Sequence, residues 1–272
     1  MTMRMDGQHA QAIRRPPILL VAFGASSAEA RGVYDHIGEA VKRHKPAHEI
    51  FWAFTSRRIV TRLRSEGIML PTLEEAHELI RRRGHRWVVL LPLLTVPGEE
   101  YANVAAFPFA GIQVACCPPL LSKESDIPRV LDALERQLRE DAVNVLVCHG
   151  NAKHDAYNDL LVRLARAMES AHGNCVVASV DGRPGTQPLH RAREIAQSTG
   201  RAHFVPFMMV SGEHVTSDVM GDKPESWKNR VGAATSTCTS SLGWNNAILN
   251  LFLKRLDEGF AQLEMEKCNE SR

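Results

Sequence analysis

Short apolar runs that alternate with stretches of helical periodicity most constrain the fold of this 272-residue chain. In the first half the apolar runs, each predicted to be a strand, are residues 18–23, 50–54, 87–94 and 112–116. The predicted helices between and after them are residues 26–43, 55–63, 72–82 and 127–139. Because strands without polar residues must be covered on both faces, this order predicts a parallel sheet flanked by helices.

The second half repeats this order and also part of the sequence. Its predicted strands are residues 143–148, 175–180 and 202–210, and its predicted helices are residues 156–169, 189–197 and 245–264. LVAFG at 20–24 parallels LVCHG at 146–150, and PLLTVPGEE at 92–100 parallels PFMMVSGEH at 206–214. We therefore predict an α/β chain with two similar Rossmann-like halves, residues 17–140 and 141–265, which follow a flexible tail (1–16) and face a central cleft.

Composition and missing motifs exclude several classes of protein. Apolar residues make up 44% of the chain and charged residues 24%, and the formal net charge is +2, so neither a nucleic acid nor a membrane is expected as a partner. The six cysteines form no CxxC pair, which argues against a zinc ribbon or a thioredoxin-like site. No apolar run has the length of a membrane span or a signal sequence, and we expect a cytoplasmic protein with reduced thiols.

Four side chains that could do chemistry follow predicted strands. His149 and Asp181 come directly after such runs, and Glu100 and His214 occupy matching positions in the two repeats. Taken singly, each histidine fits a satisfied structural role and each carboxylate fits a helix cap or a solvated loop. Because the carboxyl ends of parallel strands meet at one edge of a sheet, their shared position instead favours a ligand site. Neutral imidazoles bind borderline divalent metals and accept protons near pH 7.

The segments around these residues resemble a known family. They are AFTS at 53–56, PGEEY at 97–101, HG at 149–150 with His154, and PFMMVSGEH at 206–214 with the Asp218-to-Lys228 segment that follows. From about residue 17 to 260 the chain resembles the sirohydrochlorin cobaltochelatases of anaerobic cobalamin synthesis, class II chelatases related in fold to protoporphyrin ferrochelatase.

The resemblance implies roles for the four residues. His149 and His214 match the family's metal-binding and catalytic histidines, and Glu100 matches an acid that faces the site. Asp181 stands where the family carries a glutamate that ligates the metal, so its carboxylate is one methylene shorter. Leu94 stands where relatives often carry a histidine.

The implied activity is ATP-independent insertion of a divalent metal into sirohydrochlorin, with Co²⁺ as the expected substrate metal and no permanently bound cofactor. Insertion of Fe²⁺ or Ni²⁺ uses the same ligands and stays open. A non-catalytic carrier of metal or tetrapyrrole is an alternative of another class, whereas a hinged solute-binding protein requires a signal peptide. The resemblance also implies a homo-oligomer.

Sirohydrochlorin carries eight carboxylates, so its site must supply cations and N–H donors. Candidates follow the predicted strands or open the predicted helices: Ser26, Arg57, Arg58, Lys153 and Arg183. Each of these also fits the role of an ordinary surface residue.

Overall fold

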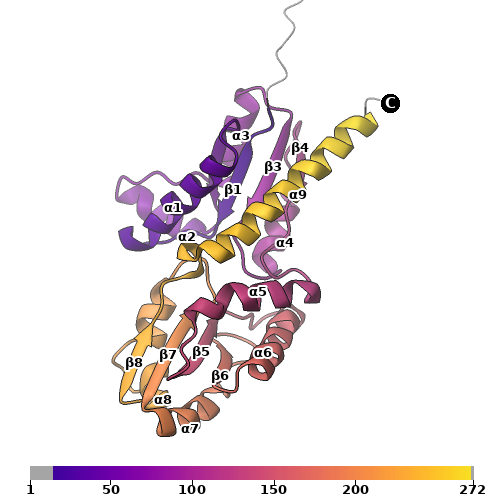
Figure 1. The fold of residues 1–272 in the computed structure, drawn as a ribbon. Coiled ribbons are helices and arrows are strands. Elements are labelled where there is room, and N and C mark those ends of the chain that lie inside the picture. Colours follow the sequence, from indigo (N-terminus) through magenta and orange to yellow (C-terminus); the bar gives the residue numbers. More distant parts are fainter. Residues whose placement is uncertain (1–14, 271–272) are drawn as a thin grey trace, which may run out of the picture.

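Two four-stranded parallel sheets form the core of the computed structural model, which describes residues 15–270 (Figure 1). The first sheet has the order β2-β1-β3-β4 and contains β1 (Ile18–Ala22), β2 (Ile50–Phe54), β3 (Trp87–Pro92) and β4 (Gln113–Cys116). The second has the order β6-β5-β7-β8 and contains β5 (Val143–Cys148), β6 (Cys175–Ser179), β7 (Arg201–Pro206) and β8 (Thr235–Cys238). The predicted fold class is confirmed. The predicted tail, residues 1–16, lies outside the described residues except for its last two.

The helices also follow the predicted order, although their ends are shifted. Two short helices and one short strand were not predicted. The first sheet is joined by α1 (Ala28–His44), α2 (Arg57–Ser65), α3 (Leu73–Arg82) and α4 (Glu99–Ala105). The remaining α-helices are α5 (Ile127–Leu134), α6 (Asp159–Ala171), α7 (Leu189–Thr199), α8 (Trp227–Val231) and α9 (Asn246–Glu270). Short α4, α8 and β8 were not predicted, because elements of four to seven residues show too little periodicity.

Strand register shows that the two halves are structural repeats, residue for residue. Ala22 is paired with Phe54, and Cys148 with Ser179, at the ends of the corresponding strands. The hydrogen bonds just beyond these ends also correspond: Ser56 N–H donates to the Phe23 carbonyl (3.0 Å), and Asp181 N–H donates to the His149 carbonyl (2.7 Å). Phe23 and His149 therefore occupy equivalent positions.

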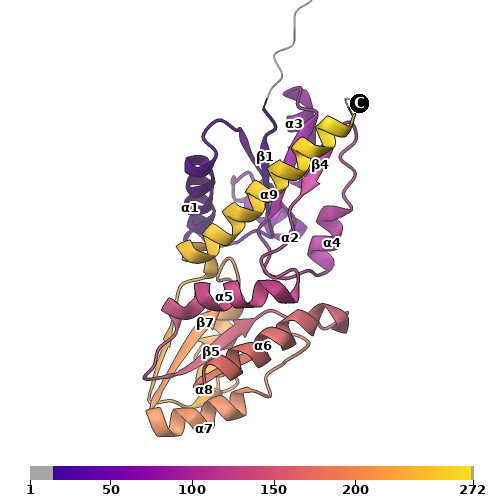
Figure 2. The same cartoon turned by 45° about the vertical axis from the view of Figure 1, so that its right-hand side comes forward.

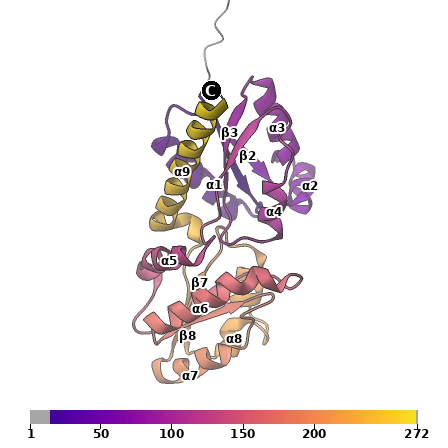
Figure 3. The same cartoon turned by 90° about the vertical axis from the view of Figure 1, so that its right-hand side faces the viewer.

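The last helix of the chain lies against the first sheet. Helix α9 contacts β3 and β4, and Figure 2 shows it running diagonally across the first half. Helices α3 and α4 cover the other face (Figure 3), where a separate apolar cluster forms with β1, β2 and β3. The cluster beneath α9 continues into the second half, so one apolar core joins both halves.

A buried ion pair fixes α9 to the segment that connects the halves. Arg255 on α9 lies 2.6 Å from the carboxylate of Asp126, and their side chains are 11% and 4% exposed. Burial alone would raise the pKa of Asp126. Hydrogen bonds from the backbone and hydroxyl of Ser122, together with the Arg255 guanidinium, outweigh burial and hold that pKa below its ordinary value.

The carboxyl ends of the two sheets point toward the junction between the halves (Figures 1 and 3). An ion pair crosses this junction, from Lys153 in the segment after β5 to Glu99 on α4, after β3 (3.6 Å). Within residues 15–270, no helix is long and apolar enough to cross a lipid bilayer.

Candidate active site

His149 is the first residue beyond β5 and is exposed, whereas all six residues of that strand are buried. Its carbonyl accepts the hydrogen bond from Asp181 N–H, which fixes the backbone. Its ring Nδ1 lies 3.0 Å from the carbonyl oxygen of Gly150. If Nδ1 carries the proton in this contact, Nε2 has the free lone pair needed to bind a metal or accept a proton.

His214 opens a six-residue π-helical segment, His214–Val219, that follows β7. The segment turns Val215 and Val219 into the core and leaves His214 exposed. Its ring Nδ1 lies 2.6 Å from a carboxylate oxygen of Asp218, four residues on. A carboxylate at this distance holds the proton on Nδ1 and orients the ring with Nε2 free. Single π turns of this kind are frequent at functional sites.

The two predicted histidines come together. Their ring centroids are 5.3 Å apart and the ring planes are nearly perpendicular, at 84°. They approach from β5 and β7, which are neighbours in the second sheet. The matching strand-end positions seen in the sequence therefore place both imidazoles at one point on the sheet edge.

Asp181, the predicted third ligand, lies beside His149 through the backbone. Its N–H bonds the His149 carbonyl, and its own carbonyl lies against the α-carbon of Gly150, where no side chain fits. Gly150 has a φ of +76°, which glycine adopts without strain. The segments after β5 and β6 are thus packed backbone to backbone next to His149. Direct ligation by the Asp181 carboxylate stays a prediction.

Buried Asn158 braces the segment that follows His149. Its side-chain oxygen accepts from Asn151 N–H (2.8 Å), and its amide group donates to the Asn151 carbonyl (2.8 Å) and to Asp155 (3.3 Å). The Asn151 side chain in turn accepts from the N–H groups of Lys153 and His154. These contacts shape the loop through the backbone N–H groups of Lys153 and His154 and do not use the side chains of those two residues.

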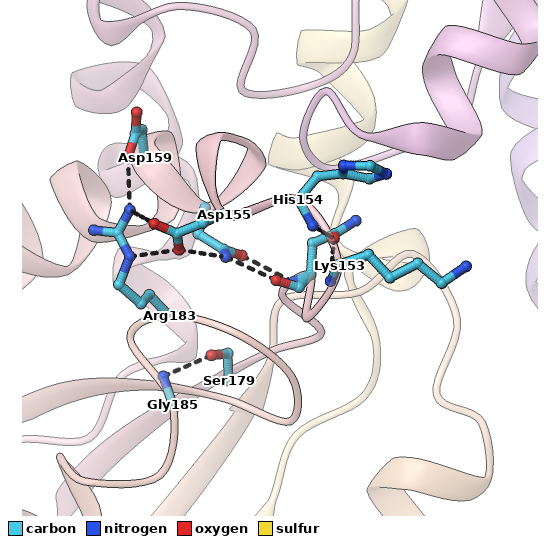
Figure 4. Close-up of polar contacts among 9 residues, drawn as sticks. Lys153, His154, Asp155, Asp159, Ser179, Arg183 and Gly185 are labelled. Atoms are coloured by element: carbon cyan, nitrogen blue, oxygen red, sulfur yellow. Dashed lines mark hydrogen bonds and ion pairs between the residues drawn. The ribbon is translucent and has the colours of Figure 1, made fainter.

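Arg183 is occupied within the protein. Its guanidinium makes a two-pronged contact with Asp155 (2.6 and 2.7 Å) and a third contact with Asp159 (3.0 Å), as Figure 4 shows. Lys153 and His154 project on the other side of the same loop (Figure 4). The structure thus gives Arg183 intramolecular partners, and its contact with substrate stays a prediction.

The first half contributes the remaining predicted residues. Glu100 lies in the first turn of α4 and is half-buried, next to the Glu99 that pairs with Lys153. Ser26 is exposed just before α1, and Arg57 and Arg58 are exposed at the start of α2. Among residues 15–270, Arg58 makes no ion pair, so its charge is available to a ligand.

The donor set is a pair of imidazoles. Across the described part of the chain, no three His, Cys, Asp or Glu side chains are placed together so as to hold a metal ion. A metal held by two histidines keeps its other coordination positions for water or another molecule, which suits an ion that is passed on. From the sequence, Asp218 was expected to cap or brace the His214 segment rather than to bind metal, but its direct contact with the His214 ring was not predicted. The spacing of four residues was its only signal.

Sequence comparisons give a consistent result. Residues 16–261 match the family described as Cobalt chelatase (CbiK). The sirohydrochlorin cobaltochelatase of Salmonella typhimurium is 30% identical over 226 residues, which cover 78% of this chain and 84% of that protein. The sirohydrochlorin cobaltochelatase CbiKC of Nitratidesulfovibrio vulgaris is 28% identical over 236 residues, or 81% of each chain.

Structural comparisons show the same fold at low sequence identity. The sirohydrochlorin chelatase SirB from Bacillus subtilis subspecies spizizenii, in complex with cobalt, has a TM-score of 0.62 at 16% identity, with 90% of this chain and 95% of that chain covered. CbiX, described as the terminal enzyme for biosynthesis of siroheme in denitrifying bacteria, has a TM-score of 0.56 at 18% identity, with 89% and 98% covered.

Proposed function

The chain belongs to the cobalt chelatase (CbiK) family, and from this premise we propose that it inserts a divalent metal ion into sirohydrochlorin for cobalamin synthesis. The observation that carries the proposal is the pair of imidazoles, His149 and His214, with ring centroids 5.3 Å apart on one sheet edge. The sequence contains no GxxxxGK(S/T) motif for binding nucleotide phosphates, and we infer that the insertion uses no ATP.

Metallation removes two pyrrole N–H protons as the metal leaves its protein ligands. His149 and His214 bind the incoming ion through Nε2, and each imidazole regains a free lone pair when the ion moves to the macrocycle. Each can then accept a proton, because the ordinary pKa of an imidazole lies near neutral pH. The exchange is balanced, because two imidazoles give up the metal ion and two pyrrole protons leave the macrocycle at the same place.

Asp218 keeps His214 ready for this exchange. Its carboxylate accepts a hydrogen bond from Nδ1–H at 2.6 Å, so the lone pair of the ring stays on Nε2. Glu100, at the repeat position equivalent to His214, supplies a carboxylate from the other half, and we assign it the transfer of protons from the site to water. Asp181, beside His149, completes the proposed ligand set directly or through a bridging water.

Co²⁺ is the metal we assign, on the description of the family and of its relatives. Affinity for two imidazoles alone does not select Co²⁺. Nitrogen ligands bind Fe²⁺ less tightly than Co²⁺ and Ni²⁺ more tightly than Co²⁺, whichever protein supplies them. A chelatase for Fe²⁺ or Ni²⁺ with the same histidines is therefore the alternative to be tested. Assembly into a homo-oligomer and a cytoplasmic location stay predictions.

The test is an anaerobic absorbance time course of sirohydrochlorin with Co²⁺, Fe²⁺ or Ni²⁺ supplied separately. The wild type is expected to accelerate metallation over the uncatalysed rate, with Co²⁺ as the fastest ion. His149→Ala and His214→Ala should each lower the rate about 100-fold or more, because both imidazoles act on the same ion.

His77→Ala is the matched control. His77 is a partly buried histidine on α3 that contacts the Ala110 carbonyl (3.1 Å) and two phenyl rings, at a place unrelated to the strand ends. Its replacement should leave the rate within twofold of wild type. Tight binding of sirohydrochlorin without faster metallation would instead identify a carrier.

A further inference from the structure

Phe23 is the structural counterpart of His149 in the first half, and its ring is exposed. All five residues of β1 are at most 2% exposed, whereas Phe23, the next residue, is 51% exposed. The equivalence rests on strand register and on the matching hydrogen bonds that the Phe23 and His149 carbonyls accept. One sheet edge thus carries an imidazole and the other a phenyl ring at the same position.

The backbone around Phe23 is held firmly although the ring is free. Its carbonyl accepts from Ser56 N–H, and the neighbouring Gly24 lies close to the side chain of Ile59, which a β-carbon at position 24 would approach to 3.3 Å. Gly24 has a φ of +110°, a conformation open to glycine, and this turn leaves the Phe23 ring outside the core. A large apolar ring fixed in the open costs free energy unless it is covered by something else.

Phe23 lies on the edge that faces the two histidines. The Lys153–Glu99 ion pair joins the segments that follow β5 and β3, so the carboxyl edges of the two sheets are opposed at the junction. A flat ligand held between these edges meets imidazoles on one side and a phenyl ring on the other. A phenyl ring neither binds a divalent metal nor accepts a proton, so the two sides differ in chemistry.

We propose that Phe23 is a substrate-positioning residue that packs against the flat, apolar ring of the tetrapyrrole, opposite His149 and His214. This inference rests on the proposed function and adds a division of labour between the halves. The second half delivers the metal and takes the protons, and Phe23 presses the macrocycle toward it. Aromatic rings favour such offset or edge contacts with conjugated rings.

The experiment measures binding of metal-free sirohydrochlorin by absorbance titration, separately from metallation. Phe23→Ala is expected to raise the Kd about tenfold, from the loss of apolar contact area. Phe23→Leu keeps an apolar side chain without the flat ring and should raise the Kd by about threefold. Binding of Co²⁺ to the free protein, measured by equilibrium dialysis, should stay within twofold of wild type in both variants.

Leu79→Ala is the matched control, because Leu79 on α3 is a large apolar residue of similar exposure, 44%, on the first half. Leu79→Ala should bind sirohydrochlorin with the same Kd as the wild type. Circular dichroism checks that the variants are folded. If Phe23→Ala does not fold, the binding measurement on Phe23→Leu decides the test. The inference is overturned if the folded Phe23 variants bind sirohydrochlorin as tightly as a wild type that metallates it. A wild type that neither binds nor metallates sirohydrochlorin would overturn the proposed function itself.

Discussion

Replacing Gly150 with alanine tests whether the close packing beside His149 places that residue for activity. A β-carbon at position 150 would collide with the carbonyl oxygen of Asp181, and it would lie 2.9 Å from the Asp181 carbonyl carbon and 3.0 Å from Ser179 Cβ. The segments after β5 and β6 must then separate. Gly200→Ala is the matched control, because Gly200 also has a positive φ (+67°) but meets no heavy atom within 4 Å.

The two variants share one cost and differ in another. An alanine forced into the left-handed region costs about 1 to 2 kcal/mol at either position. At Gly150, separation of the segments also breaks the 2.7 Å hydrogen bond from Asp181 to His149, worth about 1 kcal/mol, and loosens the packing around it. We therefore expect Gly150→Ala to lower the free energy of unfolding by about 3 kcal/mol, and Gly200→Ala by about 1.5 kcal/mol.

Thermal unfolding and the metallation assay read the two effects separately. The extra loss in Gly150→Ala corresponds to a Tm about 3 to 6 °C below that of Gly200→Ala. Displacement of His149 by about 1 Å should lower the metallation rate of folded protein by about 100-fold, whereas Gly200→Ala should keep the wild-type rate. Equal stability and equal rates in the two variants would refute this account of the packing at Gly150.

Four further predictions concern other residues. Asp218→Ala should weaken Co²⁺ binding by about tenfold in equilibrium dialysis, and an unchanged Kd would show that this carboxylate does not orient its histidine partner. Arg255→Met should cost about 3 kcal/mol in chemical denaturation, because it leaves the carboxylate of Asp126 buried without its cation, and a loss below about 1 kcal/mol would contradict the burial of the pair. Since the pKa of Asp126 is lowered by folding, its contribution is complete above about pH 4 and lost as pH falls through the folded-state pKa, so the wild type should lose stability there. Limited alkylation followed by mass spectrometry should modify exposed Cys268 before Cys148, whose thiol is buried and has a raised pKa, and the reverse order would disagree with the fold.

Local sequence accounts for much of the architecture. The apolar runs at 18–23 and 143–148 are too uniform for half-exposed strands. They form the central strands β1 (Ile18–Ala22) and β5 (Val143–Cys148), in which every residue is buried. Thr72 followed three residues later by Glu75 is the sequence pattern of a capping box at the start of α3, and hydrogen bonds run in both directions between these residues. Such features are visible in a sequence because they depend on neighbours within a few residues.

The sequence also brought out the histidine pair, through the internal repeat. His149 is the fourth residue of LVCHG, which matches LVAFG, and His214 ends the segment that matches PLLTVPGEE. Once the strands are known to be parallel, the segments that follow neighbouring strands lie at the same edge of the sheet. The 5.3 Å separation of the rings agrees with that reasoning.

What only the tertiary structure decided concerns partners that are distant in sequence or set by side-chain direction. Sequence order placed α9 after the second sheet, but it lies on the first, held there by the core and by Arg255. Arg183 was a candidate for substrate carboxylates, and the structure turns it onto Asp155 and Asp159. Periodicity reports which face of an element is apolar, and it carries no information about which distant charge a flexible side chain will meet. For that reason the sequence by itself determined the fold and pointed to the proposed histidine pair, while the hydrogen bond between His214 and Asp218 and the exposure of Phe23 became known only from the folded chain.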